Sequence, residues 1–432
     1  MVLPLTSKIA PNGHLQIGGC DIVELAERFG TPLFIYDEDT IRARCRDYVT
    51  AFDATGADTE IVYAGKAFMA LAVCRIVANE GLGLGVMSGG EIYTALRSGF
   101  PPARLLFHGN NKAADELELG LGTGVGRFVV DSFDELELLN KMAGDLGKKP
   151  KIMLRLTPGI MPSTHAYVQT GQQDSKFGFG IQDGSALAAT KRALELPNLE
   201  LTGFHAHIGS QIFALHSYNK AIEVLMAFIK EVRDRTGFEV VELDAGGGLG
   251  IKYKAHDEPS TIEAFAATIV GSVREGAAKH GLKMPKILVE PGRSIIGNAA
   301  VTAYRIGTIK EIKGIRTYVS VDGGMSDNLR PMLYKAVYDA LLANKADDPA
   351  SAKVTVAGKH CESGDIIIEE AIIPTPEVGD ILVTPATGAY GYVMANNYNR
   401  VPRPAVVLVK DGEARVIARR ETYEDLVRLE EG

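Results

Sequence analysis

Tryptophan is absent from this sequence of 432 residues, and cysteine occurs only four times, at Cys20, Cys45, Cys74 and Cys361. The cysteines are far apart and form no CxxC pair, which suggests reduced thiols in a reducing compartment. The N-terminus lacks the charged-then-apolar pattern of a signal peptide, and no apolar run is long enough to cross a membrane. We therefore expect a cytoplasmic protein without a membrane partner.

Runs of positive charge are missing as well. Lys and Arg number 46 against 54 Asp and Glu, a net charge of -8, and no basic run is interleaved with aromatic residues. Nucleic acid is therefore not an expected partner. The sequence also lacks a complete GxGxxG fingerprint, a P-loop, an HExxH motif and a nucleophile elbow. These absences weigh against hydride transfer and NTP-driven chemistry, and no metal is expected.

The sequence does contain a regular alternation of strand-like and helical patterns. Strand-like runs lie at 61–64, 84–87, 104–107, 128–130, 152–156, 201–207, 241–244 and 287–290. Amphipathic helical patterns lie between them, for example at 133–146, 218–235 and 262–280. This α/β pattern predicts a (β/α)8 barrel of the TIM type, with a doubly wound open sheet as the structural alternative.

Beyond residue 291 the pattern changes to that of a second, mainly β domain. Strands are expected at 301–312, 317–321, 354–356, 365–373, 380–384 and 405–409, and only 329–342 and 423–429 look helical. The strand at 33–36 is expected to join this domain. The predicted division is residues 37–290 for the barrel, and residues 1–36 with 291–432 for a β-barrel- or sandwich-like domain.

Lys66 follows the first strand-like run and precedes a helical pattern over 67–80. It is therefore expected at the carboxyl end of a strand, where a barrel exposes its chemistry. Partial desolvation among Tyr63, Phe68 and Met69 would lower the pKa of the amine and make it a nucleophile. Taken alone, Lys66 is more simply a lysine that reaches solvent at a strand end.

Three further stretches end predicted strands. His205, His207 and Ser210 end the sixth, Gly246, Gly247 and Gly248 follow the seventh, and Glu290-Pro-Gly-Arg293 follows the eighth. Each stretch has a structural alternative: core histidines, a tight turn and a plain ion pair. Together, however, an amine, a glycine loop that suits a phosphate, a carboxylate and an imidazole match the needs of pyridoxal 5'-phosphate (PLP).

An ordered set of motifs resembles the fold-type III PLP-dependent decarboxylases, which have an alanine-racemase-like barrel. The motifs are YAGKA at 63–67, HAHIGSQ at 205–211, DAGGG at 244–248, EPGR at 290–293 and CESGD at 361–365. The resemblance runs from about residue 12 to residue 409 and includes TGQQDSKFG at 170–178 and GAY at 388–390. No single motif is specific, but the ordered set is.

The resemblance implies a role for each matched residue. Lys66 would hold PLP, His207 would stack on its ring, and Glu290 would keep the pyridine nitrogen protonated. Cys361 would donate the proton that replaces CO2. The remaining cofactor contacts would come from Ser210, Gly247, Gly248, Gly292, Arg293 and Tyr390.

The implied reaction is the release of CO2 from meso-2,6-diaminopimelate to give L-lysine, the last step of lysine biosynthesis. An arginine fork suits the distal carboxylate of this substrate, and a glutamate suits the ammonium. Cys361 and Glu362 would reach across a homodimer interface into the partner's site. The substrate contacts would come from Arg293, Arg330, Tyr334, Glu362 and Tyr390.

One departure from the family pattern is Gly85, where relatives often carry an acidic residue, so local support for Lys66 or His207 is expected to differ. The nearest alternative function is a sister decarboxylase acting on ornithine, arginine or carboxynorspermidine. Two others are a PLP-binding regulatory homologue without turnover and a cofactor-free phosphosugar barrel.

Overall fold

The computed structural model describes residues 2–160 and 175–432, which form two compact units. The unit called here the barrel unit comprises Cys45–Gly250 and Glu258–Gly292. The unit called the β unit comprises Met1–Arg44, Ile251–Asp257 and Arg293–Gly432. Residues 161–174, which include the start of the motif at 170–178, lie outside the described residues.

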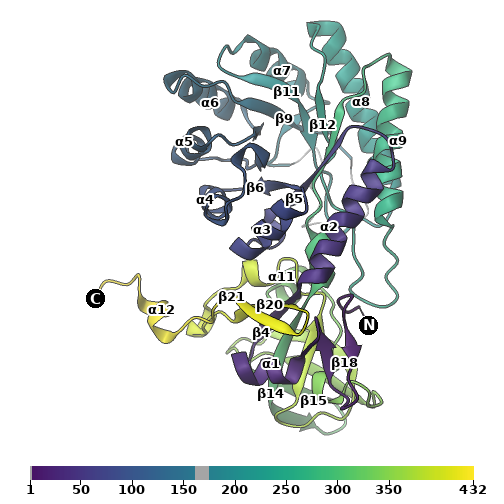
Figure 1. The fold of residues 1–432 in the computed structure, drawn as a ribbon, viewed down its shortest axis with the longest axis vertical. Coiled ribbons are helices and arrows are strands. Elements are labelled where there is room, and N and C mark those ends of the chain that lie inside the picture. Colours follow the sequence, from purple (N-terminus) through teal and green to yellow (C-terminus); the bar gives the residue numbers. More distant parts are fainter. Residues whose placement is uncertain (1, 161–174) are drawn as a thin grey trace. The chain divides into compact units, whose positions relative to one another are not determined.

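Eight parallel strands close into a barrel in the barrel unit (Figure 1), because β8 pairs with β9 at the seam. Each lies within two residues of a predicted strand, so the predicted barrel is confirmed. A two-residue strand, β10 (Phe179–Gly180), extends β9. The barrel strands are β5 (Thr59–Ala64), β6 (Gly83–Val86), β7 (Leu105–Phe107), β8 (Arg127–Val130), β9 (Lys151–Thr157), β11 (Glu200–Ala206), β12 (Glu242–Asp244) and β13 (Lys286–Val289).

Helices lie around the outside of these strands (Figure 1), and local sequence signals define their ends. Ser88 caps α4 by accepting a hydrogen bond from the backbone N–H of Glu91, and Gly99 ends it in the left-handed region. Thr261 and Gly281 play the same roles for α9. The helices are α3 (Leu71–Asn79), α4 (Gly89–Ser98), α5 (Ala114–Thr123), α6 (Phe133–Asp145), α7 (Ser185–Glu195), α8 (His216–Thr236) and α9 (Ile262–His280).

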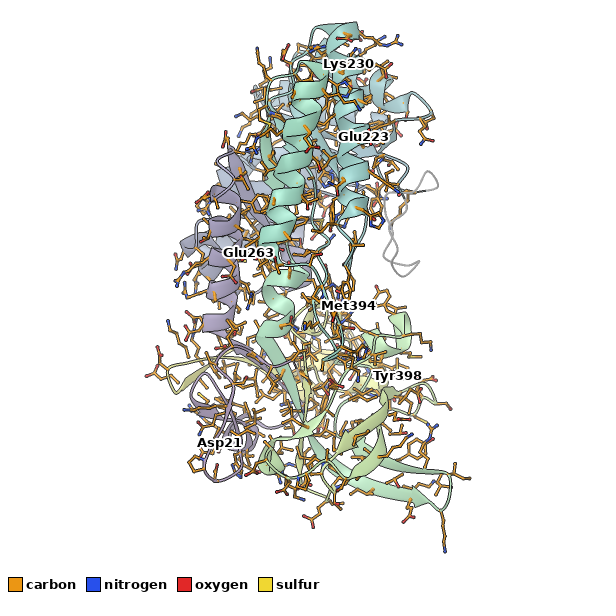
Figure 2. All side chains as sticks on the ribbon, turned by 90° about the vertical axis from the view of Figure 1, so that its right-hand side faces the viewer. Asp21, Glu223, Lys230, Glu263, Met394 and Tyr398 are labelled. Atoms are coloured by element: carbon orange, nitrogen blue, oxygen red, sulfur yellow. The ribbon has the colours of Figure 1, made fainter. Side chains whose placement is uncertain are left out.

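The two longest of these helices are amphipathic. Glu223 and Lys230 on α8 and Glu263 on α9 carry their charges on the surface (Figure 2), whereas Ile222 and Phe265 are buried at 1% exposure. Burial of the apolar faces against the strands stabilises these helices. None of the helices in the described ranges is long and apolar enough for a membrane crossing.

A charged network lies at the amino ends of the barrel strands, opposite the end at which Lys66 and Glu290 lie. Arg127 donates to Glu242 (Nη2 to Oε1, 2.7 Å) and to Glu60 (Nη2 to Oε2, 2.9 Å). Lys286 Nζ lies 2.7 Å from Oε2 of Glu60. Burial alone would raise the pKa of both carboxyls, but Lys286 and Arg127 lower the pKa values. The resulting stability is therefore present above the ordinary carboxyl pKa of 4.5 and is lost as the pH falls through the lowered pKa.

We expect Arg127→Met to lower the free energy of unfolding by about 3–5 kcal/mol, because two largely buried carboxylates lose their shared partner. Denaturant unfolding followed by circular dichroism measures the loss. Arg192→Met is the matched control, since Arg192 pairs with Glu137 and Glu195 on the surface, and its unfolding midpoint should barely move. Equal losses in the two variants would contradict a stabilising role for the buried network.

The β unit is built on a sheet of nine strands with the order β18-β17-β15-β14-β4-β20-β21, in which β19 pairs with β14 and β16. As predicted, the strand near residue 33 joins this unit, because β4 pairs with β14 and β20. The strands are β4 (Leu33–Asp37), β14 (Ala300–Ile312), β15 (Arg316–Val321), β16 (Leu341–Leu342), β17 (Ala352–Ala357), β18 (Ile366–Ile373), β19 (Ile381–Pro385), β20 (Ala405–Lys410) and β21 (Glu413–Ala418).

Smaller elements complete the β unit. Apolar side chains of α1 and of the sheet, such as Ile22, Ile35 and Val407, pack into one buried cluster. A three-stranded sheet forms near the N-terminus, and α2 begins in the β unit and ends in the barrel unit. These elements are β1 (Lys8–Ile9), β2 (Leu15–Ile17), β3 (Cys20–Asp21), α1 (Ile22–Phe29), α2 (Glu38–Asp53), α10 (Arg293–Ile296), α11 (Arg330–Tyr334) and α12 (Tyr423–Val427).

The helix expected over 67–80 begins later than predicted. The chain first makes a 3-10 turn, η1 (Gly65–Ala67), Phe68 is extended, and α3 starts only at Leu71. A Cβ at Gly65 would lie 2.8 Å from the carbonyl oxygen of Gly85, so the close approach of β5 and β6 shapes this turn. Lys66 therefore lies on a tight turn rather than directly before a helix.

The helix expected over 329–342 is wrong beyond Tyr334. α11 stops after five residues because Lys335 adopts a left-handed φ of 55°. Leu341–Leu342 instead forms β16, which pairs with β19. Burial of Tyr338 and strand pairing override the helical spacing of this segment. β21, which pairs with β20 as a hairpin, was not predicted.

Candidate active site

Lys66 extends from η1 at the carboxyl end of β5. The backbone N–H of Ala64 donates to the carbonyl of Pro291 at 3.0 Å, which joins the end of β5 to the segment after β13. The hydroxyl of Tyr63 donates to the carbonyl of Phe68 at 2.8 Å and braces the turn. The Lys66 side chain is exposed, so the expected partial burial among its neighbours is not seen and does not supply its activation.

Glu290 follows β13, and its carboxylate lies between two imidazoles. Oε1 is 2.5 Å from Nε2 of His108, and Oε2 is 3.2 Å from Nε2 of His205. Both histidines are buried, and their ring centroids are 5.0 Å apart. His108 follows β7 and His205 lies in β11, so barrel closure brings the three side chains together from separate strands.

The two imidazoles determine the charge state of this cluster. Burial alone would raise the pKa of Glu290, but His108 and His205 hold it well below its usual range. Burial lowers the pKa of His205 to about 4, even though Glu290 acts in the opposite direction. At neutral pH, Glu290 is therefore an ionised carboxylate that accepts a hydrogen bond from a neutral His205.

The glycine loop after β12 is required by close backbone packing. A Cβ at Gly247 would lie 2.0 Å from the carbonyl oxygen of Glu290, and one at Gly248 would lie 2.2 Å from that of Gly209. Gly248 also has a φ of +103°, a conformation that L side chains rarely adopt. The loops that carry Gly209-Ser210, Gly247-Gly248 and Glu290 therefore pack against one another at one end of the barrel.

His207 lies beside this loop, after β11. Its Nδ1 accepts a hydrogen bond from the backbone N–H of Gly247 at 3.3 Å. Burial lowers the pKa of His207 well below its usual value, and the charges of Lys66 and Arg155 add to the effect. His207 is therefore a neutral, flat ring within electrostatic reach of the Lys66 amine.

These residues fit PLP. The glycine loop and Ser210 suit its phosphate, since backbone N–H groups and a hydroxyl are donors from which an anion accepts hydrogen bonds. An ionised Glu290 suits a protonated ring nitrogen, and a neutral imidazole suits the ring face. The ligand atoms of His108, His205 and Glu290 also lie within 4.8 Å of one another, a donor set that can accept a divalent cation. The adjacent glycine loop and the Lys66 amine favour PLP over a divalent cation here, because a metal ion would bind neither of them.

The β unit holds most of the other predicted cofactor and substrate residues. Arg293 begins α10 and Arg330 begins α11, and both are buried, at 7% and 6% exposure. The guanidinium carbon of Arg293 lies 4.8 Å from the ring centroid of Tyr390, which has a φ of 58°. Tyr334 is half-buried at the end of α11. Gly292 belongs to the barrel unit, where its Cβ would lie 3.0 Å from that of Ala64.

Cys361 and Glu362 are exposed on a loop between β17 and β18. Asp365 holds this loop by accepting hydrogen bonds from the backbone N–H groups of His360 (2.9 Å) and Met325 (2.7 Å). The backbone N–H of Cys361 donates to Oδ1 of Asn399 at 2.9 Å. The loop is therefore anchored, while the thiol and the carboxylate remain accessible.

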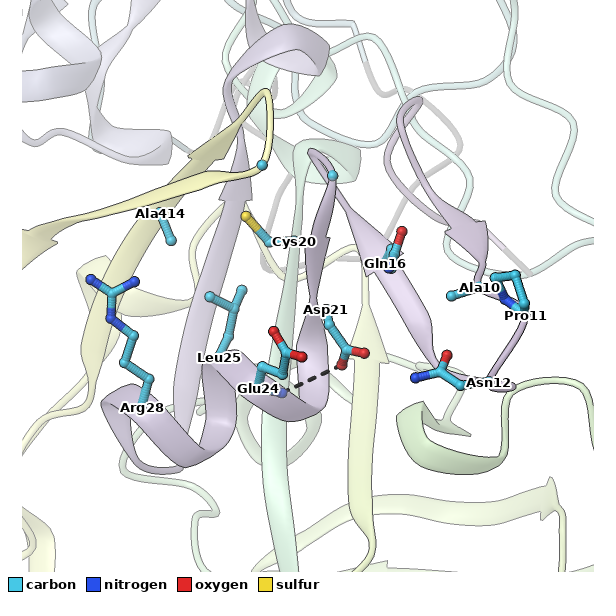
Figure 3. Close-up of a pocket in the computed structure, with 12 residues that line it drawn as sticks. Ala10, Pro11, Asn12, Gln16, Cys20, Asp21, Glu24, Leu25, Arg28 and Ala414 are labelled. Carbon is cyan, nitrogen blue, oxygen red and sulfur yellow. Dashed lines mark hydrogen bonds between the residues drawn. The ribbon is translucent and has the colours of Figure 1, made fainter.

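A separate cavity of about 470 Å³ lies in the β unit near Cys20, Asp21, Glu24 and Arg28 (Figure 3). Asp21 Oδ1 caps α1 through the N–H groups of Val23 and Glu24, and Oδ2 pairs with His14 at 2.9 Å. The central carboxylate of this cavity is therefore already satisfied within the unit. It contains none of the residues expected to carry the chemistry.

Some residues of the site were missed by sequence reasoning. His108 directly follows the predicted strand at 104–107, so an inspection of strand ends like the one that singled out His205 would have found it. Arg155, in β9, is buried at 9% exposure and could have been noticed as a charge within an apolar strand.

Gly85 leaves room beside His108, because an added Cβ would lie 3.8 Å from its Cδ2.

A protein-family model described as "Pyridoxal-dependent decarboxylase, pyridoxal binding domain" matches residues 38–297. This span contains the whole set of barrel residues described above, from Lys66 to Gly292. The match is to a cofactor-binding domain, in agreement with the fit of the site to PLP.

Full-length relatives give the same result. The chain is 46% identical to a diaminopimelate decarboxylase of Bacillus subtilis (strain 168), covering 100% of this chain and 98% of the relative. It is 47% identical to one of Halalkalibacterium halodurans, covering 98% and 97%. A crystal structure of diaminopimelate decarboxylase from M. jannaschii in co-complex with L-lysine superposes with a TM-score of 0.93 at 35% identity, covering 100% and 99%. This chain therefore belongs to the diaminopimelate decarboxylase family of pyridoxal-dependent decarboxylases.

Proposed function

We propose that this chain removes CO2 from the D-configured centre of meso-2,6-diaminopimelate and yields L-lysine. The observation that carries the proposal is the convergence of Lys66, His207, the glycine loop and Glu290 at one end of the barrel. Relatives named diaminopimelate decarboxylase, at 46% and 47% identity over nearly their whole length, support this substrate.

PLP, when bound, supplies an electron sink for the electron pair left on the substrate carbon after CO2 departs. Lys66 supplies the amine that holds it, and the glycine loop, Ser210 and Arg293 bind its phosphate. Glu290, ionised between His108 and His205, holds the proton on the ring nitrogen. His207 covers one ring face, and because it is neutral it adds no second positive charge.

The β unit supplies the substrate contacts in this proposal. Arg330 binds the distal carboxylate, with Arg293, Tyr334 and Tyr390 beside it, and Glu362 binds the distal ammonium. The proposed division into a cofactor domain at 37–290 and a β domain formed by 1–36 and 291–432 is supported by the family model, which spans 38–297. The compact units differ from this division in that residues 37–44 and 251–257 belong to the β unit and residues 291–292 to the barrel unit.

We also propose a homodimer in which Cys361 and Glu362 complete the partner's site. Their exposure on an anchored loop supports this role, since residues that serve another subunit extend outward from their own. The thiols of Cys20 and Cys74, which are buried and form no disulfide, support a cytoplasmic location.

The function is tested by the absorbance spectrum of the purified protein before and after meso-diaminopimelate is added, with lysine and CO2 measured as products. A bound-cofactor band that changes on addition, with both products formed, is the expected result. Ornithine and arginine are assayed in parallel. A higher kcat/KM for either would replace the proposed substrate with that of a sister decarboxylase.

We expect Cys361→Ala to lower kcat by roughly a hundredfold, because the proton that replaces CO2 loses its donor. Cofactor uptake, measured from the absorbance band, should not change. Ser363→Ala on the same exposed loop is the matched control and should retain activity. Undiminished turnover by Cys361→Ala would rule out the proton-donor role.

A further inference from the structure

Tyr253 lies in the segment Ile251–Asp257, which belongs to the β unit although it follows the glycine loop in the sequence. Its side chain is buried, with 8% exposed. The phenolic oxygen accepts hydrogen bonds from Nη1 of Arg293 at 2.5 Å and from Nη1 of Arg330 at 2.9 Å. One oxygen therefore joins two guanidinium groups that extend from different helices, α10 and α11.

Tyr338 also binds the guanidinium group of Arg330. Its hydroxyl accepts a hydrogen bond from Nη1 of Arg330, and its ring is 1% exposed. The rings of Tyr253 and Tyr338 pack edge to face, with centroids 5.5 Å apart and an interplanar angle of 89°. The guanidinium carbon of Arg330 lies 5.0 Å from the first centroid and 5.7 Å from the second. The phenols therefore restrain this arginine by hydrogen bonds and by cation–π contact.

The segment that carries Tyr253 is anchored on both sides. Oδ2 of Asp257 accepts hydrogen bonds from the backbone N–H of Tyr253 at 2.8 Å and from that of Lys254 at 2.9 Å. Nζ of Lys254 donates to the carbonyl of Tyr338 and to Oδ1 of Asp339, both at 2.5 Å. Since Lys254 links the two tyrosine-bearing segments, the phenols that hold Arg330 are fixed before any ligand arrives, which reduces the entropic cost of binding.

The hydrogen bonds of Arg330 leave its positive charge in place. Within the described ranges, no carboxylate lies at ion-pair distance from Arg330, and its side-chain hydrogen bonds go to two phenols. A phenol accepts hydrogen bonds from buried N–H groups but does not neutralise their positive charge. A buried positive charge favours the binding of an added anion. Burial alone would raise the pKa of Tyr253, but the charges of Arg293 and Arg330 lower it, a further sign of strong positive potential at this point.

We propose that Tyr253 is a positioning residue that joins Arg293 and Arg330 into one rigid fork for the distal carboxylate of the substrate. The inference rests on the proposed function and deepens it. A carboxylate in place of Tyr253 would orient the arginines equally well but would neutralise them. The shared phenol therefore favours a substrate tail that ends in a carboxylate over a tail that carries only an ammonium.

The test is Tyr253→Phe in the PLP-loaded enzyme, since this change removes one oxygen and keeps the ring. The KM for meso-diaminopimelate is expected to rise about tenfold, equivalent to about 1.4 kcal/mol, with kcat within about threefold of wild type. Calorimetry with pimelate, a seven-carbon dicarboxylate without amino groups, should show a similar loss of affinity. The melting temperature should not change.

Two variants sharpen the comparison. Tyr338→Phe removes an acceptor from Arg330 alone and should raise KM less than Tyr253→Phe does; the opposite order would overturn the role of the shared oxygen. Tyr93→Phe is the matched control, because Tyr93 is 60% exposed on α4, and it should match wild type in every readout.

Different results would refute the role of Tyr253 and the proposed reaction. If wild type does not decarboxylate meso-diaminopimelate, the proposed function is wrong, while pimelate binding still tests the fork. A KM and a pimelate affinity that Tyr253→Phe leaves within twofold would overturn the inference. So would a joint fall in kcat and melting temperature at unchanged KM, which would identify Tyr253 as only structural.

Discussion

Lys66→Ala is expected to lower kcat for meso-diaminopimelate by at least roughly a thousandfold, about 4 kcal/mol in activation free energy. The amine at the end of β5 is the group that would hold PLP covalently, and alanine offers no nucleophile. The purified variant should lose the bound-cofactor absorbance band. Treatment with borohydride should no longer leave the cofactor attached to the chain.

The matched control is Lys191→Ala, an exposed lysine on α7 outside the site. It should keep the spectrum and the activity of wild type. Because the Lys66 side chain is exposed, its removal creates no cavity, and the fold of the variant should be intact by circular dichroism. Normal turnover by Lys66→Ala would discard the proposed mechanism.

Glu290→Gln should lower kcat by roughly a hundredfold to a thousandfold, about 3–4 kcal/mol. An amide cannot ionise, so the ring nitrogen would lose the anion that holds its proton. His108 and His205 would also lose the carboxylate between them. The glycine loop is unchanged in this variant, and PLP should therefore still bind.

Stopped-flow kinetics with a spectrum of the loaded variant separates these effects. Glu223→Gln is the control, a carboxylate on the surface of α8 that pairs with Lys279 (Figure 2). It should be indistinguishable from wild type. A Glu290→Gln enzyme that bound no PLP would show that Glu290 holds the cofactor rather than tuning its ring nitrogen.

Sequence patterns predicted the barrel well because buried strands bounded by turns leave a local signal. The strand-like runs at 84–87 and 287–290 correspond to β6 and β13, each shifted by one residue. The same signal predicted Lys66, His207 and Glu290 at one end of the barrel, since residues that follow parallel strands share an edge.

Predictions failed where a distant segment decides the local conformation. Spacing alone predicted a helix directly after Lys66, but packing of Gly65 against Gly85 imposes a 3-10 turn. Spacing also extended α11 to residue 342, whereas pairing with β19 makes its last two residues a strand. A short segment does not contain the contacts that override its own propensity.

The sequence by itself determined the element types of the barrel, the chemical groups available at its strand ends and the family resemblance, because these depend on residue identity and local periodicity. Only the tertiary structure decided which groups meet: His205 contacts Glu290 across 85 residues of sequence, and Tyr253 contacts Arg330 across 77. Barrel closure and sheet packing bring such residues together, and no local pattern encodes either contact.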